Sequence, residues 1–235
     1  MLAPAYALRS RIQIRDVLEP DGAEAVLRSL EAETLWGVVF NDRANVVQIP
    51  AEQAAQLTLD DQHHLLQQIH ARARTGYQFF YNSYPVSKAY FAQDPLPGSL
   101  AEIYEVLNSA SFLQFVRTVT GLPQIRWADA HATLYRAGHF LKYHTDENAA
   151  EHRLAAYVLN LTKGWGRDWG GYLQFFNERY DIEEGYRPVF NALNLFTVPA
   201  DHSVSMISAY APGSRYSITG WFRGDLPPGP IAIDR

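Results

Sequence analysis

The sequence contains no cysteine among its 235 residues. Disulfide bonds, iron–sulfur clusters and cysteine-ligated zinc sites are therefore excluded, and any metal site must use His, Asp or Glu side chains. No apolar run approaches the length of about 18 residues that a transmembrane helix needs, and the N-terminal residues lack the apolar segment of a signal peptide. These absences predict a cytoplasmic protein that does not cross a membrane.

Positive charge is also scarce, because 20 Lys and Arg residues stand against 25 Asp and Glu residues and give a formal net charge of −5. Proteins that bind nucleic acid through its phosphates are usually basic, so this balance argues against a general nucleic-acid binder. Apolar residues make up 47% of the sequence and aromatic residues 13%. This composition is typical of a globular protein with a large core or an aromatic-lined cleft.

The first half of the chain is predicted to be mainly helical. Apolar residues at helical spacing predict helices over residues 23–32, 58–75, 99–107 and 111–120. Alternating apolar and polar residues predict short strands over residues 11–18, 34–40 and 45–49. Between these elements, residues 76–97 are rich in aromatic side chains. They have two interpretations, part of the core or a flap over a functional site, since long insertions often carry function.

From residue 123 onward the pattern is that of a β-protein. Strands are expected over residues 125–135, 140–144, 154–161, 171–175, 193–197, 203–210 and 215–222. Helices followed by a series of short strands predict an α+β fold, in which an antiparallel sandwich or barrel is covered by helices on its outside. We expect one domain over residues 1–235, in which residues 1–122 support a β-core formed by residues 123–223.

The motif His144-Thr145-Asp146 places two metal-binding side chains two residues apart. On a β-strand such side chains point to the same face, so both can reach one ion. His202 begins another strand-like run and can supply a third ligand. Two imidazoles and one carboxylate form the ligand set that suits non-haem Fe(II) and leaves positions open for chemistry.

Arg215 begins the strand-like run that follows His202. An inward-facing guanidinium can bind a carboxylate through two parallel hydrogen bonds, as the far end of a 2-oxo acid such as 2-oxoglutarate would need. Thr219 lies on the same strand face and could add a hydroxyl, and the hydroxyl of Tyr135 could donate a hydrogen bond to the same molecule.

Asp129 and His131 share a predicted strand face with Tyr135. They form a second His/Asp pair at strand spacing, so they could compete as metal ligands or line the pocket. Gly170 and Gly171 predict a sharp turn or a close approach of the backbone to the site.

Five segments, LYRAGHFLKYHTD, RLAAYVLNLT, WGGYLQFF, FNALNLFTVPADHSVSMIS and RYSITGWF, together resemble the core of the prolyl 4-hydroxylase-type Fe(II)/2-oxoglutarate dioxygenases. The resemblance covers roughly residues 125–223 and is nearest to bacterial proteins similar to the hypoxia-sensing and ribosomal prolyl hydroxylases. It implies a double-stranded β-helix (jelly-roll) fold with Fe(II), 2-oxoglutarate and O₂ as cofactor and co-substrates, and ascorbate as a candidate supporting reductant.

The resemblance also implies a role for each matching residue. His144, Asp146 and His202 match the catalytic iron ligands. The residues that match the 2-oxoglutarate pocket are Arg215, Tyr135, Thr219, Asn160, Leu173 and Trp221. Animal oxygen sensors have a tyrosine where this chain has Asn160.

Three functions remain open from the sequence. The first is hydroxylation of a prolyl residue in a protein or peptide, with release of succinate and CO₂. The second is the same chemistry on a free amino acid or another small molecule. The third is a non-catalytic metal-binding β-barrel, which Arg215 disfavours because such a barrel needs no cation for a co-substrate. The sequence leaves the hydroxylated target and the oligomeric state open.

Overall fold

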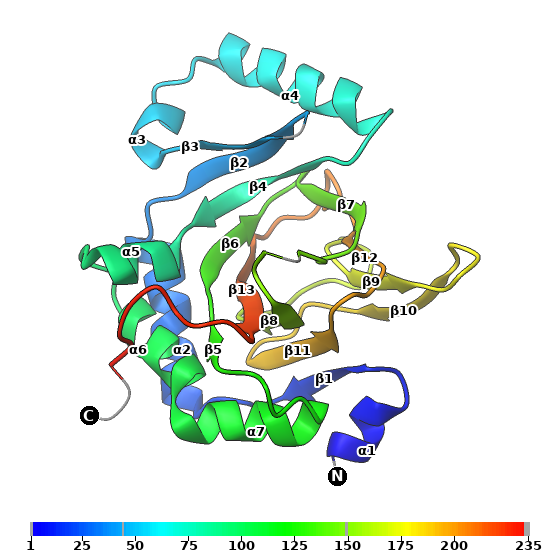
Figure 1. Ribbon diagram of the computed structural model, residues 1–235. Coiled ribbons are helices and arrows are strands. Elements are labelled where there is room, and N and C mark those ends of the chain that lie inside the picture. The colour runs from blue at the N-terminus through cyan, green and yellow to red at the C-terminus, as the bar shows by residue number, and fades with distance from the viewer. Residues whose placement is uncertain (1, 44, 149, 233–235) are drawn as a thin grey trace.

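Helices pack on the outside of a large, curved antiparallel sheet in the computed structural model, which describes residues 2–43, 45–148 and 150–232 (Figure 1). The helices are α1 (Leu2–Ala7), α2 (Pro20–Arg28), the π-helix η1 (Ser29–Glu33), α3 (Ala51–Ala54), α4 (Leu59–Ala73), α5 (Val86–Ala92), α6 (Leu100–Asn108) and α7 (Ala110–Thr120). None of the helices in these residues is long and apolar enough to span a membrane.

The strands follow each other around a curved sheet. They are β1 (Arg11–Arg15), β2 (Gly37–Asp42), β3 (Asn45–Ile49), β4 (Phe79–Tyr84), β5 (Trp127–Ala128), β6 (His131–Tyr135), β7 (Phe140–His144), β8 (Arg153–Asn160), β9 (Leu173–Phe176), β10 (Ile182–Tyr186), β11 (Ala192–Thr197), β12 (His202–Val204) and β13 (Arg215–Arg223). Their order in the sheet is β1-β11-β8-β13-β6-β4-β7-β12-β9-β10, with β2 and β3 continuing from β4 and β5 pairing with β13.

The two ends of this strand order meet, so the sheet is nearly closed into a barrel. Arg11 on β1 donates a hydrogen bond of 2.6 Å from Nε to Glu184 on β10, and it also pairs with Glu183. The predicted α+β class with a double-stranded β-helix core is therefore confirmed.

Local sequence explains where two of the helices begin and end. Thr58 accepts a hydrogen bond from the backbone N–H of Asp61, whose carboxylate accepts one from the N–H of Thr58, so a capping box begins α4. Ser109 caps α7 in a similar way, and Gly121 ends that helix with a positive φ of 71°. Glycine adopts this left-handed conformation without the steric cost of a Cβ atom.

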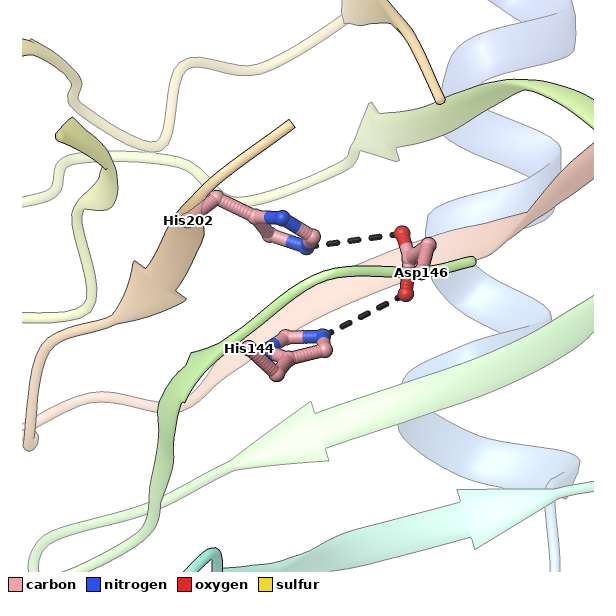
Figure 2. A group of neighbouring side chains, drawn as sticks. All are labelled: His144, Asp146 and His202. Carbon is pink, nitrogen blue, oxygen red and sulfur yellow. Dashed lines mark ion pairs between the residues drawn. The ribbon is translucent and has the colours of Figure 1, made fainter. Parts of the chain in front are cut away.

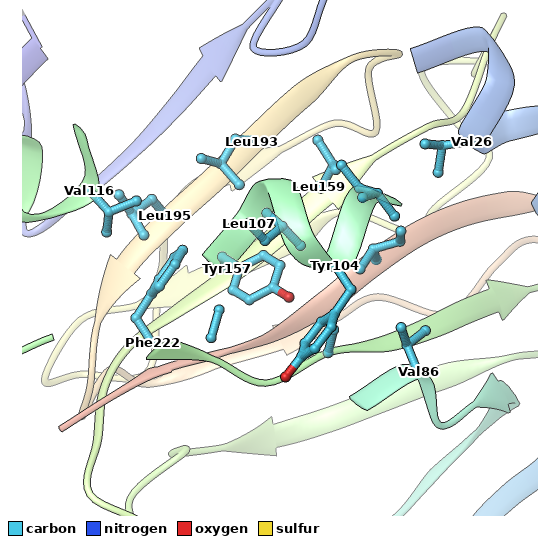
Figure 3. Close-up of a cluster of buried hydrophobic side chains, with 14 of the residues drawn as sticks. Val26, Val86, Tyr104, Leu107, Val116, Tyr157, Leu159, Leu193, Leu195 and Phe222 are labelled. Carbon is cyan, nitrogen blue, oxygen red and sulfur yellow. The ribbon is translucent and has the colours of Figure 1, made fainter. Parts of the chain in front are cut away.

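The main hydrophobic core lies between the helices and the sheet (Figure 3). Tyr104 and Leu107 of α6 pack there with Tyr157 of β8, Leu193 of β11 and Phe222 of β13, all of them nearly inaccessible to solvent. The core thus joins side chains from both halves of the chain. The opposite face of β8 and β13 is turned towards the inside of the barrel, where the functional site lies.

The aromatic segment 76–97 is not a flap. Its residues form β4, an inner strand that pairs with β2, β6 and β7, and the helix α5, which packs on the main core through Val86. The core interpretation holds for Phe80, which packs with Ile69 of α4, whereas Phe79 and Tyr81 line the cavity at the functional site.

Several other boundaries also differ from the expectation. The strand predicted over residues 125–135 is interrupted at Asp129, whose side-chain Oδ1 accepts a hydrogen bond from the backbone N–H of Trp221. The strand predicted over residues 203–210 is only three residues long, and α1 and β10 were not expected.

Candidate metal centre

Two histidines from paired strands and an aspartate from the loop after β7 converge at one end of the barrel (Figure 2). His144 is the last residue of β7 and His202 is the first of β12, and these two residues are direct partners in the antiparallel pair. Asp146 follows β7 by two residues. Its Oδ1 lies 3.3 Å from Nε2 of His144, and its Oδ2 lies 3.4 Å from Nε2 of His202.

The orientation of each imidazole is set by a backbone carbonyl. Nδ1 of His144 lies 2.9 Å from the carbonyl oxygen of Lys142, and Nδ1 of His202 lies 2.8 Å from that of Ala200. Because a carbonyl can only accept, both Nδ1 atoms carry a proton, and in the neutral imidazole this leaves Nε2 with the lone pair that a metal ion needs. Such bonds to the second ring nitrogen are typical of metal-binding histidines.

Burial and charge shift the pKa values of this group in directions that suit metal binding. Burial lowers the pKa of His202 to about 4, so the imidazole is neutral near pH 7. Burial favours the protonated form of Asp146, but the contacts of its oxygens with His144 and His202 outweigh burial and lower the pKa to about 2. The set therefore offers a neutral imidazole at His202 and a carboxylate at Asp146, with Nε2 of His144 beside them.

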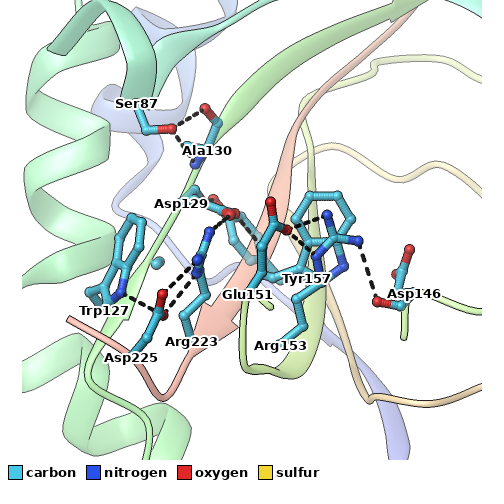
Figure 4. Close-up of polar contacts among 12 residues, drawn as sticks. Ser87, Trp127, Asp129, Ala130, Asp146, Glu151, Arg153, Tyr157, Arg223 and Asp225 are labelled. Carbon is cyan, nitrogen blue, oxygen red and sulfur yellow. Dashed lines mark hydrogen bonds and ion pairs between the residues drawn. The ribbon is translucent and has the colours of Figure 1, made fainter. Parts of the chain in front are cut away.

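Within the described residues, His144, Asp146 and His202 are the one group of three or more His, Asp or Glu side chains that could hold a metal ion. Their ligand atoms all lie within 4.8 Å of one another. The donor set and the neutral state of His202 fit Fe(II). The alternative that Asp129 and His131 are the ligands is wrong, since the carboxylate of Asp129 is occupied by the N–H of Trp221 and by Arg223 (Figure 4).

A cavity of about 930 Å³ extends from these three residues into the barrel. Strands β6, β8, β9 and β13 form its walls, and the β2–β3 hairpin and β4 line its rim. Of the residues predicted for the co-substrate pocket, five line the cavity: Tyr135, Leu173, Thr219, Trp221 and Arg215. His131 lines the cavity as well, which agrees with the prediction that it lines the pocket.

Arg215 is a buried cation without an anion. Its side chain is only 2% exposed, and its Nε atom has no hydrogen-bond partner among the described residues. Burial lowers the pKa of this guanidinium, and no carboxylate of the described residues is close enough to oppose that effect. An unpaired buried charge is strongly unfavourable, so a carboxylate-bearing ligand fits this position.

Tyr135 lies directly opposite Arg215 in the pairing of β6 with β13. The guanidinium carbon of Arg215 is 5.0 Å from the centre of the Tyr135 ring, and the ring of Tyr81 stacks on that of Tyr135 with 4.9 Å between the ring centres. The hydroxyl of Tyr135 makes no hydrogen bond to another described residue, although the residue is buried. It is therefore free to donate one to a ligand in the cavity.

Two predicted pocket residues differ from their expected roles. The hydroxyl of Thr219 donates to the backbone carbonyl of Tyr157 at 2.8 Å, so it is not available as a donor to a carboxylate. Asn160 is fully buried but does not line the cavity, and its Oδ1 atom has no partner among the described residues. Its contact with a co-substrate stays a prediction.

The sequence analysis did not identify three other polar side chains of the cavity. Thr133 and Ser217 form the rung next to Tyr135 and Arg215, with their hydroxyl oxygens 2.8 Å apart. Arg153 lies across the ring of Trp221, 3.5 Å from its centre, and donates to the carbonyl of Asp146 at 3.3 Å (Figure 4). The alternation of Arg215, Ser217 and Thr219 was a signal for Ser217, but Arg153 had no local pattern.

Gly170 and Gly171 explain how the loop before β9 approaches the site. Both have positive φ values, of 74° and 70°. A Cβ atom on Gly171 would lie 2.5 Å from a methyl group of Ile207 and 3.3 Å from Cδ of Arg215. The predicted close approach of the backbone is confirmed, and it packs the stem of Arg215 in place.

Comparison with known proteins agrees with this geometry. Residues 130–223, which include the three candidate ligands and all of the predicted pocket residues, match the family model of the 2OG-Fe(II) oxygenase superfamily. No curated protein sequence matches the chain.

Solved structures share the fold. A prolyl 4-hydroxylase from Pseudomonas putida is 19% identical with a TM-score of 0.58, and the match covers 96% of this chain and 98% of that one. A prolyl hydroxylase from Trichoplax adhaerens, solved with a peptide fragment of a hypoxia inducible factor, is 15% identical with a TM-score of 0.54, covering 95% and 88%.

Proposed function

We propose that this protein, a 2OG-Fe(II) oxygenase by its residues 130–223, hydroxylates a prolyl residue in a protein or peptide. Enzymes of this superfamily use Fe(II), 2-oxoglutarate and O₂, and the reaction releases succinate and CO₂. We assign Fe(II) to His144, Asp146 and His202, and the 2-oxoglutarate to the cavity between these ligands and Arg215.

The observation that carries the proposal is the unpaired charge of Arg215 in the same cavity as the three ligands. A protein that only binds a metal has no use for a buried cation that no protein anion neutralises. A dicarboxylic co-substrate explains it, because one carboxyl group can approach the metal ligands while the other reaches the guanidinium. The planar fork of arginine matches a carboxylate in two hydrogen bonds.

Neighbouring residues would position the co-substrate and keep water away from it. The bound metal would activate O₂ for insertion of one oxygen atom into a C–H bond. The hydroxyl of Tyr135 can donate to the co-substrate, and the apolar surface of Leu173 and the indole of Trp221 shield the cavity walls. The carbonyls of Lys142 and Ala200 hold both imidazoles in place, so the ligands need little rearrangement on binding.

The polypeptide nature of the substrate rests on two observations. The cavity of about 930 Å³ is far larger than a free amino acid together with 2-oxoglutarate would fill, and it opens at a rim formed by the β2–β3 hairpin. The Trichoplax adhaerens enzyme with the same fold was solved with a peptide fragment bound. These observations favour a prolyl residue within a chain over free proline.

The other parts of the proposal concern the protein as a whole. Residues 1–122 and 123–223 act as one catalytic unit, because their side chains share the main core. The protein acts in the cytoplasm, which suits a chain without cysteine.

Mass spectrometry of a host proteome treated with the purified enzyme, Fe(II) and 2-oxoglutarate tests the proposal. We expect prolyl peptides that gain the mass of one oxygen atom with wild-type enzyme but not with the His202→Ala variant. If ¹⁸O₂ labels only free proline or another metabolite, the polypeptide substrate is refuted. If no product is labelled while succinate is still released, hydroxylation itself is refuted.

A further inference from the structure

Strand β3 forms a free edge of the sheet next to the cavity. It pairs with β2 alone among the described strands, whereas β2 also pairs with β4. In Figure 1 the hairpin projects from the barrel beside β4 and beneath α4. Free edges present unpaired backbone N–H and C=O groups, which are a template for another strand.

The backbone of Val46 and Gln48 points towards this free edge. Asn41, the partner of Val46, uses both of its backbone groups on the other side of β2, where its N–H and C=O each bond the side chain of Gln78 at 2.8 Å. Asn41 and Val46 are therefore a pair without mutual hydrogen bonds. The alternation of an antiparallel ladder gives the same orientation to Gln48, the partner of Val39.

The side chains of these two residues face the functional site. Val46 and Gln48 line the rim of the cavity, and Val46 is 68% exposed. Val47 and Ile49 point to the opposite face, where they pack with Leu65 of α4. α4 therefore covers one face of the hairpin and leaves the face towards the cavity open.

We propose that an extended segment of the polypeptide substrate adds to β3 as an antiparallel or parallel strand and so delivers the target residue into the cavity. This inference rests on the proposed function. The N–H and C=O groups of Val46 and Gln48 supply up to four hydrogen bonds at a repeat of about 6.8 Å, which matches every second residue of an extended chain.

The hydrogen-bonding groups at the edge of β3 determine which molecule can bind there. A row of alternating donors and acceptors at this repeat is complementary to a polypeptide backbone, and a free amino acid is too short to use it. Every second side chain of the docked strand would face the cavity, as Val46 and Gln48 do. Recognition through the backbone would also tolerate many sequences around the target residue, with selectivity left to the side chains at the rim.

Substitution by proline distinguishes the contribution of the backbone N–H to substrate binding from that of the side chain. In Gln48→Pro the outward N–H is lost while the bonds to β2 remain, because this residue donates nothing to β2. Gln48→Ala removes the same side chain but keeps the N–H, so it is the matched variant. Succinate release is measured with two pools of synthetic peptides, one of about twelve residues with a central proline and randomised flanks, and one of tripeptides with a central proline.

We expect wild-type enzyme to turn over the long pool more efficiently than the tripeptides. The ratio of kcat/KM for the long pool to that for the tripeptides should fall about fivefold in Gln48→Pro relative to Gln48→Ala, the loss expected for one hydrogen bond. Hydrogen exchange at Val46 and Gln48 should slow when the long peptides bind.

Equal ratios in the two variants would overturn the docking of a strand on β3 and leave the proposed function intact. So would a wild-type enzyme that prefers neither pool. If free proline is hydroxylated and neither pool is, the polypeptide substrate itself is refuted, and the docking site with it.

Discussion

The two ends of the cavity satisfy their charges in different ways. At one end the carboxylate of Asp146 lies 3.3 and 3.4 Å from two imidazoles, each of which is held by a backbone carbonyl. At the other end Arg215 is buried with no anion among the described residues. The candidate metal ligands thus lie together within the protein itself, whereas the arginine end has no anion of its own, and we propose that a carboxylate of the co-substrate supplies it.

Each end of the cavity is formed by one pair of neighbouring strands. The pairing of β7 with β12 brings His144 and His202 together, and the pairing of β6 with β13 places Tyr135 opposite Arg215. The first pair builds a site from residues far apart in sequence. The second pair holds the buried, unpaired charge of Arg215. A ligand that neutralises this charge binds more tightly, because the unfavourable free energy of the unpaired charge is removed.

Loss of a ligand at the metal end should have the largest effect. His202→Ala removes one of three donors, so we expect Fe(II) affinity and turnover to fall by more than about 100-fold, the upper range for residues that only support a ligand. Metal content after dialysis and 2-oxoglutarate turnover measure this loss. Unaltered iron binding would contradict the assignment of the ligands.

Arg215→Met should weaken the binding of the co-substrate and stabilise the protein without ligands. The KM for 2-oxoglutarate should rise by about 100-fold, because two hydrogen bonds to a charged group are lost. The free energy of unfolding of the protein without ligands should increase by about 2 kcal/mol, since an unpaired buried charge is replaced by an apolar side chain.

Arg215→Lys is the matched control, which keeps the charge without the planar fork, and its KM should rise less. Chemical denaturation with and without 2-oxoglutarate measures the stability. A variant that is less stable than wild type without ligands would show that Arg215 has a partner within the protein.

A second buried carboxylate, that of Asp129, differs from Asp146 in the direction of its pKa shift. Burial raises the pKa of Asp129 to about 6, despite the N–H of Trp221 and the guanidinium of Arg223. Between about pH 4 and pH 6 the folded protein keeps this proton while the unfolded chain has lost it, so stability is highest below this range and falls as the pH rises. Asp129→Asn keeps the oxygen that accepts from Trp221 and removes the titration.

We therefore expect the stability of Asp129→Asn relative to wild type to increase by roughly 3 kcal/mol between pH 4 and pH 7, since each pH unit is worth about 1.4 kcal/mol. Urea denaturation at a series of pH values checks this difference. A difference that does not vary with pH would show that Asp129 titrates normally.

Thr219→Val should have the smallest effect. The hydroxyl of Thr219 already donates to the carbonyl of Tyr157, so its loss should change the KM for 2-oxoglutarate by less than about fivefold and should cost about 1 kcal/mol of stability. Steady-state kinetics and thermal unfolding test both numbers. A rise in KM as large as that of Arg215→Met would restore Thr219 as a direct ligand of the carboxylate.

The sequence predicted those parts of the molecule that depend on local pattern. The helices over residues 58–75 and 111–120 and the alternation of β13 follow from neighbouring residues. The spacing of His144 and Asp146 indicated that both can reach one ion, although Asp146 lies two residues beyond the end of β7. The strand-like run that begins at His202 indicated a third ligand, and the resemblance to a known family supported that choice.

Features that depend on tertiary contacts were missed. The aromatic residues of β4 alternate as in any half-buried strand, but only the pairing with β6 and β7 shows that the strand is internal. Thr219 looked like a free hydroxyl because its acceptor, the carbonyl of Tyr157, lies on another strand. Arg153 could not be assigned to the cavity, because its place depends on the ring of Trp221.

The central claim is that one molecule spans the metal ligands and Arg215. Anaerobic titration of the Fe(II) protein with 2-oxoglutarate and with 2-oxobutyrate, which lacks the second carboxylate, tests it through the visible absorption of the iron-bound keto acid. We predict that wild type binds 2-oxoglutarate about 100-fold more tightly and that Arg215→Met loses this preference. Equal affinity of wild type for the two acids would contradict the account.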